Sequence, residues 1–365
     1  MKSLSKQLIL LLFAGAFSLN VSAQAPKFVN EFLNIGVGAR AHGMFGSVVA
    51  DVSDVTAGFW NPAGLANVTS PFEVSAMHAE WFGSVANYDY LAIGKRLDAD
   101  QRSYGALSII RMGVDNIPNT LSLIGPDGSV DYDRVTTFSA ADYAMLLSYA
   151  KGMKKPGMSI GGSAKIIRRS IGSFGGAWGF GFDLGWMLKK EKFSLGIMAK
   201  DITTTFNTWS FNLTDEEKAV FAQTGNDIPV SSTEINLPKL LVAGAYKITK
   251  PKVSYLVQAQ LNISSNGTQA GVFSGDKVNL DPTLGLEIGI IDRVFIRAGI
   301  GNIQNVINEV NSIESSLEFQ PNIGLGVNVG RLNIDYALTN LAEVSGALSS
   351  HIVSLRLRFE ERSSL

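Results

Sequence analysis

Long stretches of alternating apolar and polar residues are the feature that most constrains the fold of this chain. From residue 72 onward, runs of about 9 to 13 residues place an apolar, often aromatic, side chain at every second position. The intervening residues are mostly Gly, Gln, Asn, Asp, Glu and Arg. Strands of globular proteins average about 5–6 residues, whereas membrane-spanning strands need about 9–11. The runs therefore favour an all-β transmembrane antiparallel barrel over a soluble sandwich.

Composition narrows the function classes. Lys and Arg number 31 against 32 Asp and Glu, so the charge balance argues against a nucleic-acid partner. The chain contains no cysteine, which excludes disulfides, thiolate metal sites and a cysteine nucleophile. Hydrophobic residues make up 46% of the chain, which argues against disorder.

The first residues predict a secreted protein. Lys2 and Lys6 precede an apolar stretch at 8–19, and the small-residue end Val21-Ser22-Ala23 follows. This is the pattern of a signal peptide over 1–23, cleaved after Ala23. The alternative, a membrane anchor, is disfavoured because the apolar run has only about 12 residues and a spanning helix needs about 20. We therefore expect the mature chain in the outer membrane, in contact with its lipid.

The alternating runs predict fourteen strands. They lie at 72–82, 87–97, 102–112, 139–151, 157–170, 177–189, 192–201, 238–249, 252–263, 279–291, 294–302, 319–329, 331–340 and 349–360. Single-chain bacterial barrels have an even number of strands, with short periplasmic turns and long external loops. The connections alternate in this way, so the barrel occupies 72–360 and the tail 361–365 lies in the periplasm.

The hairpin around Asp292 predicts a particular ion pair. Outward residues are even-numbered on both of its strands, and directly opposed residues share a face. A three-residue turn at 291–293 then places Glu287 opposite Arg297, with both side chains in the lumen. The alternative is that water solvates each side chain separately.

Residues 24–71 do not show the strand pattern. The segment is rich in Gly and Ala, and many predicted inward positions of the barrel are also glycine. A barrel of fourteen strands is wider than side chains alone can fill. We therefore expect 24–71 to form a short-helical plug inside the lumen, with a disordered periplasmic tail as the alternative.

Sequence signals for catalysis, metals and cofactors are weak. Gly157-Met158-Ser159-Ile160-Gly161 matches the nucleophile-elbow pattern, but that motif needs a strand-to-helix turn and here it opens a strand. His42, His78 and His351 are widely spaced and form no zinc motif. Gly36-Val37-Gly38 lacks the preceding strand of a dinucleotide site. The chain is expected not to be an enzyme and to hold no metal or cofactor.

The predicted loop 202–237 is the strongest candidate for a contact surface outside the plug. It is far longer than ordinary hairpin loops, and Thr214 followed by acids predicts a helix within it. Its aromatic residues form either an external docking surface or a lid over the barrel mouth, and the sequence does not decide between these. They are Phe206, Trp209, Phe211 and Phe221.

The plug segment carries a family resemblance. The stretches 32–44 and 60–66, with Asp54 between them, resemble the N-terminal signature of the PorV/PorQ family, and Asn61-Pro62-Ala63-Gly64 also resembles FadL-like fatty-acid transporters. The residues that carry it are Gly36, Gly38, Arg40, Gly43, Trp60, Asn61, Pro62 and Gly64. The resemblance implies a FadL-like outer-membrane barrel of the type IX secretion system, whose partners are the translocon, a surface attachment complex and the C-terminal domains of cargo proteins.

Two functions follow as hypotheses. The first is a non-enzymatic barrel that binds or shuttles secreted cargo proteins between translocon and attachment complex. The second is a FadL-like transporter of hydrophobic small molecules. A transporter needs an apolar cavity near the plug and a gap or kink in the wall, whereas a shuttle needs a sealed lumen and an external docking face. A structural subunit of another envelope complex makes no distinct prediction.

Overall fold

The computed structural model describes most of the chain after the predicted signal peptide. The described ranges are 29–98, 102–125, 128–265, 273–274, 278–307, 315–341 and 349–360. The signal peptide at 1–23, its cleavage site and the tail 361–365 lie outside the described residues.

The described strands form one antiparallel sheet that closes on itself, because β1 pairs with β2 on one side and with β17 on the other. Fourteen of them form the barrel wall. These are β1 (Phe72–Trp81), β2 (Ala86–Arg96), β3 (Ser103–Asn119), β4 (Thr136–Gly152), β5 (Met158–Ile171), β6 (Gly175–Lys189), β7 (Phe193–Lys200), β10 (Lys239–Thr249), β11 (Val253–Ser264), β13 (Asn279–Ile290), β14 (Val294–Ile307), β15 (Ser315–Val329), β16 (Leu332–Thr339) and β17 (Ser350–Phe359). The predicted fold class and strand number are confirmed.

Three short strands and two short helices belong to the connections. They are β8 (Thr205–Phe211), β9 (Thr233–Asn236), β12 (Phe273–Ser274), η3 (Tyr132–Arg134) and α4 (Asp215–Gln223). β8 pairs with the far half of β6 and with β9, so both extend the wall beyond β7 and β10. We call the end of the barrel that holds 201–238 the loop end, and the opposite end the turn end.

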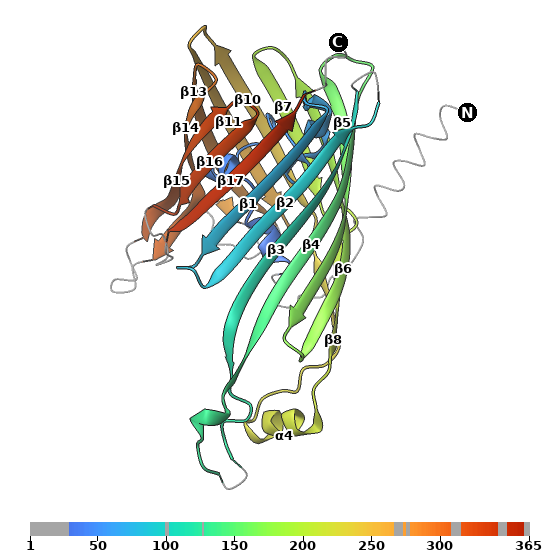
Figure 1. The fold of residues 1–365 in the computed structure, drawn as a ribbon, viewed down its shortest axis with the longest axis vertical. Coiled ribbons are helices and arrows are strands. Elements are labelled where there is room, and N and C mark those ends of the chain that lie inside the picture. The colour runs from blue at the N-terminus through green and yellow to red at the C-terminus, as the bar shows by residue number, and fades with distance from the viewer. Residues whose placement is uncertain are drawn as a thin grey trace, which may run out of the picture.

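One side of the barrel is taller than the alternation predicted. β3 and β4 each have 17 residues, and Figure 1 shows β3, β4, β6 and β8 running beyond the rest of the wall toward α4. The predicted third strand ended at 112 because the register of β3 against β4 shifts between Val114 and Ile117. Such a bulge breaks the period-two pattern while hydrogen bonding continues beyond it.

The outer face carries the apolar belt that the alternation predicted. Strand β6 illustrates it: four of its apolar side chains are half-exposed and point outward, namely Trp178, Phe180, Phe182 and Leu184. The intervening Asp183 is buried. At the loop end of β1–β4, the belt is bounded by a row of outward polar residues that face one another across neighbouring strands. They are His78, Asp89, Arg111 and Tyr143. The row contains ion pairs between His78 Nδ1 and Asp89 at 2.7 Å and between Arg111 and Asp89 at 3.5 Å.

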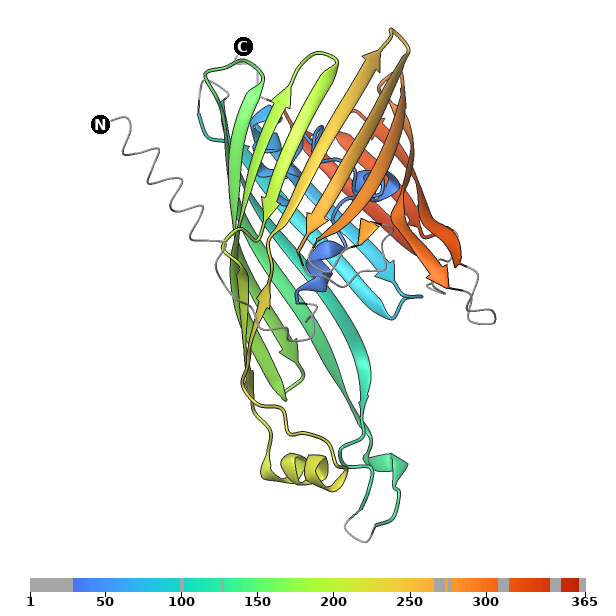
Figure 2. The same ribbon diagram turned by 180° about the vertical axis from the view of Figure 1, so that it is seen from behind.

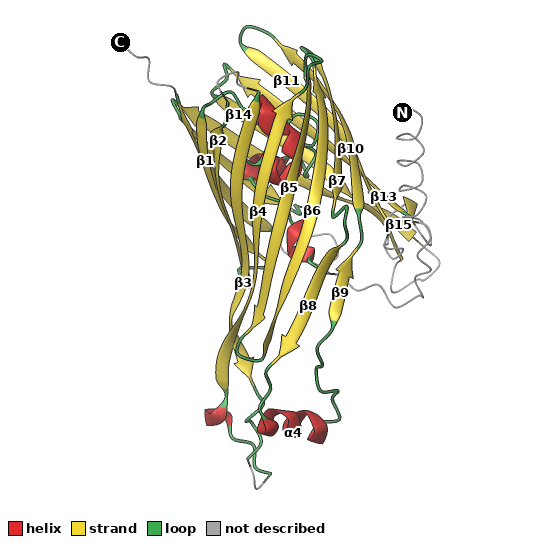
Figure 3. Cartoon of the chain, turned by 90° about the vertical axis from the view of Figure 1, so that its right-hand side faces the viewer, coloured by secondary structure: helices red, strands yellow, loops and turns green. Residues whose placement is uncertain are grey.

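The lumen is occupied by the segment before β1, as Figures 2 and 3 show. Its short helices are η1 (Glu31–Asn34), α2 (Ala39–Gly43), α3 (Ala57–Trp60) and η2 (Pro62–Asn67). We call described residues 29–71 the plug. Many of its apolar side chains are buried with inward residues of the wall in one hydrophobic cluster. None of the described helices has the length and apolar character needed to cross a membrane.

Inward glycines let the plug backbone approach the wall. An added Cβ at Gly161 or Gly185 would collide with the Asn61–Ala63 segment, and one at Gly196 would collide with the backbone of Val49. Glycine on an inner barrel face is thus explained by close backbone approach. These glycines of the wall therefore leave the space that the plug backbone occupies.

Candidate functional site

The first half of the plug motif folds the chain around Trp60. The indole Nε1 of Trp60 donates a hydrogen bond of 2.8 Å to the carbonyl oxygen of Val37. Gly36 has a φ of +95°, and a Cβ there would lie 2.7 Å from the Trp60 ring. Glycine fits this position because it tolerates a left-handed backbone and leaves room for the ring. Gly38 is the N-cap residue before α2, the helix that carries Arg40.

The second half of the motif ties the plug to the wall. Asn61 donates from Nδ2 to the carbonyl oxygens of Val49, at 2.9 Å, and Trp186, at 3.2 Å. Its Oδ1 accepts a hydrogen bond from the backbone amide of Ala63 and so caps η2, in which Pro62 is the first residue. Gly64 is buried in the same helix.

Helix α2 lies directly on the wall. A Cβ at Gly43 would be 2.9 Å from the Cα of Gly324 in β15. Arg40, one turn earlier, forms ion pairs with Glu287 at 2.8 Å and with Asp51 at 3.2 Å. The plug is therefore held by both close packing and charge.

The predicted lumen pair belongs to a longer network. Glu287 lies opposite Arg297 in the β13–β14 register, and their side chains form an ion pair of 2.7 Å. Arg297 also pairs with Asp335 at 2.6 Å, while Glu287 binds Arg40 of the plug. Charges of opposite sign thus alternate from plug to wall, and each buried charge has a partner, as burial requires.

A second ion pair joins the plug to the last strand. Asp54 pairs with Arg356 of β17. Burial alone would raise the pKa of the Asp54 carboxyl, but Arg356 and the hydrogen bonds from Thr56 hold it below its usual value. Asp54 therefore stays ionised inside the plug.

A cavity of about 520 Å³ lies between the plug and the loop end, and we call it the vestibule. Aromatic rings of Phe45, Phe59 and Trp60 contribute to its lining. Lys200 places its Nζ 4.5 Å from the centre of the Phe59 ring, and Lys239 donates to Asn34 Oδ1 at 3.1 Å. The vestibule lining is therefore mixed, with these aromatic rings beside a larger number of polar and charged residues, among them Glu31, Asp281 and Asn302.

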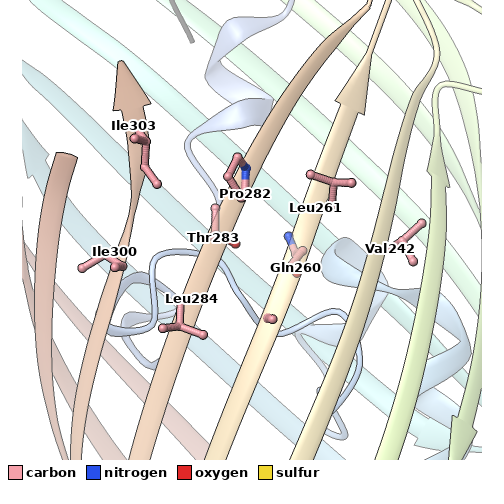
Figure 4. A pocket seen from close by; sticks show the side chains of 9 residues that line it. Val242, Gln260, Leu261, Pro282, Thr283, Leu284, Ile300 and Ile303 are labelled. Carbon is pink, nitrogen blue, oxygen red and sulfur yellow. The ribbon is translucent and has the colours of Figure 1, made fainter. Parts of the chain in front are cut away.

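A second cavity of about 430 Å³ lies on the outer face of the barrel wall (Figure 4), and we call it the wall groove. It is lined by Val242, Ala259, Gln260, Leu261, Pro282, Thr283, Leu284, Ile300 and Ile303. Most of these side chains are apolar. Gln260 and Thr283 are buried and line both the wall groove and the vestibule. Only this thin part of the wall separates the two spaces.

The ladder between β13 and β14 ends at the same place. Among the described residues, β13 and β14 pair as far as Leu284 and Ile300, and the pairing stops there. β14 continues instead along β15, with a register shift between Gly301 and Gln304. Pro282 lacks the amide hydrogen that would continue the ladder. The resulting seam between β13 and β14 lies between the vestibule and the groove.

The structure places two strands and a helix within the predicted loop 202–237. Trp209 is buried at 7% exposure, donates from Nε1 to Glu234 at 3.0 Å and stacks on Phe211. Phe206 is 48% exposed, but it lies on β8, and Phe221 is half-buried on α4. Much of the predicted loop is thus β8 and β9, which continue the wall, and a docking or lid role of these aromatic residues stays a prediction.

The residues with weak chemical signals are scattered through the fold, and His42 among them lines the vestibule. Gly157 is in a turn, and Ser159 donates to the carbonyl oxygen of Ala63 at 2.9 Å. His42 is buried in the plug, while His78 and His351 face outward. Within the described ranges, no group of three His, Cys, Asp or Glu side chains could hold a metal ion.

Sequence reasoning missed the seam. Pro282, inside a predicted strand, could have indicated the seam, because proline interrupts the hydrogen bonds of a central strand. The predicted run 279–291 contained that residue, and the alternation around it concealed the interruption.

No protein-family model matches the chain, and no curated protein matches it in sequence. Solved structures do match. The toluene transporter TodX of Pseudomonas putida has a TM-score of 0.56 and 14% identity, covering 89% of this chain and 98% of that one. The toluene transporter TbuX of Ralstonia pickettii has a TM-score of 0.53 and 13% identity, covering 89% and 99%. A Pseudomonas aeruginosa FadL homologue has a TM-score of 0.53 and 12% identity, covering 89% and 98%. At these identities the likeness concerns architecture, and the described chain has a FadL-like fold: a closed antiparallel barrel of fourteen strands.

Proposed function

We propose that this protein is an outer-membrane transporter of hydrophobic small molecules. The molecule enters the vestibule from the loop end and leaves sideways through the seam into the membrane. The observation that carries the proposal is the end of β13–β14 pairing at Leu284 and Ile300, between the vestibule and the wall groove. The same function is supported by the similar structures, which include two toluene transporters.

The plug favours a sideways path over an axial one. On the turn side of α2 the lumen retains a cavity of about 20 Å³, lined by charged residues that include Arg40, Asp54, Asp335 and Arg356. A space of that size holds about one water molecule. A hydrophobic molecule moving along the axis would have to displace buried ion pairs, whereas the seam leads from the vestibule to an apolar groove.

The outer surface of the barrel supports the proposed location in the outer membrane. The outward apolar belt fits lipid, and it is bounded at the loop end by the polar row that contains His78 and Asp89. Together with the predicted signal peptide, this supports insertion in the outer membrane.

Filling the wall groove tests the proposal. Ala259 is an exposed, outward residue that lines the groove, and Ala259→Trp would fill part of it. Ala298 is also outward and exposed, on β14 outside the groove, so Ala298→Trp is a matched control. The assay is uptake of radiolabelled toluene or a long-chain fatty acid by cells that express each variant.

The proposal expects Ala259→Trp to lower uptake several-fold while Ala298→Trp leaves it unchanged. Equal expression and heat-modifiable electrophoretic mobility would show that all the barrels are folded. Two outcomes would contradict a path through the seam. One is equal uptake by cells with and without the protein, and the other is an equal reduction of uptake by both variants.

A second candidate function is the shuttling of type IX cargo proteins. The plug motif that resembles the PorV/PorQ family supports it, as does the tall wall that carries the exposed Phe206 on β8. Its partners would be the translocon, the attachment complex and cargo C-terminal domains. Purification in mild detergent followed by mass spectrometry tests it. Recovery of a large translocon barrel or of secreted proteins sharing a C-terminal domain would favour the shuttle, and replacement of the exposed Phe206 with Ala should then reduce that recovery.

A further inference from the structure

A cavity of about 400 Å³ lies at the turn end, on the opposite side of the plug from the vestibule. Its lining comes from four places that the fold brings together, namely the end of the plug, the end of β2, the turn between β15 and β16, and the end of β17. The lining residues are Thr69, Ser70, Pro71, Arg96, Gly330, Arg331, Arg358, Phe359 and Glu360. We call this cavity the rim pocket. The transport path proposed above does not use it.

The rim pocket is strongly cationic. Arg96 donates a hydrogen bond to the carbonyl oxygen of Thr69, and Arg331 forms an ion pair of 2.9 Å with Glu360. Arg358 makes no side-chain hydrogen bond or ion pair with the described residues. Arg331 and Arg358 therefore share one lining carboxylate, that of Glu360, which leaves the positive charge of Arg358 in excess.

A nearby carboxylate does not remove this excess. Glu73 lies opposite Arg358 in the register of β1 and β17. Its oxygens are buried and accept hydrogen bonds from Ser70 Oγ at 2.6 Å and from the backbone amide of Val55 at 3.0 Å. Glu73 is thus engaged with the plug, and the Arg358 guanidinium is left for another anion.

The pocket also reaches the outer surface. Phe359 lines it, and the Phe359 ring lies 5.2 Å from the ring of Phe72 on the neighbouring strand. Both residues belong to the outward series of β1 and β17 that forms the apolar belt. The cationic lining is therefore continuous with a surface that faces lipid.

We infer that the rim pocket binds the phosphate group of a membrane phospholipid, with an acyl chain lying against Phe72 and Phe359. Guanidinium groups bind phosphate oxygens through two parallel hydrogen bonds, and they remain charged at all physiological pH values. Basic pockets at the membrane surface bind lipid headgroups for this reason. The inference requires a barrel in a membrane but does not depend on what the barrel transports.

Lipid binding by the full-length barrel in detergent micelles tests the inference. The probe is fluorescent phosphatidylglycerol, titrated by anisotropy against wild type and Arg358→Gln. Arg293→Gln is the matched control, because Arg293 is exposed in the turn between β13 and β14, at the same end but outside the pocket. We expect Arg358→Gln to bind about tenfold more weakly, as loss of one charged hydrogen-bonding group predicts, and the control to bind as wild type does.

Competition identifies the source of the phosphate. Unlabelled phosphatidylglycerol should displace the probe, phosphatidylcholine should do so less well because its quaternary amine is repelled, and inorganic phosphate should fail at millimolar concentration. Displacement by inorganic phosphate as effective as by the lipid would instead assign the pocket to a small free anion and overturn the inference.

Two further results would overturn it. One is equal binding by wild type and Arg358→Gln, and the other is an equal loss in Arg293→Gln, which would indicate general surface charge. Arg331→Gln provides a second pocket variant with an exposed side chain, so that a folding defect of Arg358→Gln cannot decide the outcome. Heat-modifiable mobility checks folding in every variant.

Discussion

Arg40 of the plug and Glu287 of β13 are 247 residues apart in the chain, yet the Arg40 Nε and a Glu287 carboxylate oxygen lie 2.8 Å apart. The same carboxylate also binds Arg297 of β14 at 2.7 Å. One buried acid thus joins the plug to β13 and β14, the two strands that border the seam. The contact fixes where α2 lies in the barrel.

Replacing Glu287 with Gln should strongly destabilise the protein. The substitution leaves Arg40 and Arg297 buried with one partner fewer, and breaking a buried ion pair in this way costs about 3–5 kcal/mol. The midpoint of guanidinium unfolding in detergent measures the change. Asp215→Asn, which removes an exposed pair with Lys218, should leave the midpoint unchanged. A Glu287→Gln midpoint equal to that of the control would contradict a structural role for the network.

Replacing Gly43 with Ala should loosen the plug. The new Cβ would lie 2.9 Å from the Cα of Gly324 and 3.2 Å from its backbone nitrogen. Because these are backbone atoms that cannot rotate away, α2 must move. We expect frequent openings in single-channel recordings from planar bilayers, where the wild type stays closed. Gly152→Ala is the control, since its Cβ would meet no atom closer than 3.6 Å. Closed recordings from Gly43→Ala would show that the plug does not depend on this contact.

His42 should make the plug sensitive to acid. Burial lowers the pKa of His42 from 6.5 to about 4, although a hydrogen bond with the carbonyl oxygen of Gly36 acts in the opposite direction. Below pH 6.5 the unfolded chain binds a proton that folded His42 does not. The free energy of unfolding therefore falls by about 3 kcal/mol as the pH drops from 6.5 toward 4.

Thermal unfolding across that pH range measures the effect. His42→Gln should lose about 3 kcal/mol less than the wild type over the same range. His351→Gln, on the outer face beside Tyr336, should retain the wild-type response. An identical pH response of wild type and His42→Gln would exclude His42 as its source.

Replacing Trp209 with Ala should affect the tall wall alone. The Arg169 guanidinium lies 5.1 Å from the centre of the Trp209 ring, and Trp209 Nε1 binds Glu234 of β9. Loss of the ring should expose 205–236 to limited proteolysis while the thermal midpoint of the barrel changes little. Phe206→Ala removes an exposed ring from the same strand, and the protease should cleave this variant at the wild-type rate. Equal rates for both variants would contradict a bracing role of Trp209.

The sequence predicted the barrel because period-two alternation is a local signal. The apolar face of β6, at Trp178 to Leu184, and the register of Glu287 with Arg297 both follow from counting residues along single strands or one short turn. The tall wall was underestimated because the bulge near Val114 shifts the alternation, so the pattern alone ended the third strand too early.

What the sequence determined by itself was therefore which segments pair and which face of each meets lipid. Only the tertiary structure decided where Arg40 meets Glu287, where the β13–β14 ladder ends beside the vestibule, and how Arg96, Arg331 and Arg358 come together. The physical reason is distance along the chain. Alternation and turns depend on neighbouring residues, whereas these sites depend on barrel closure and on how the plug fills it, which no local pattern records.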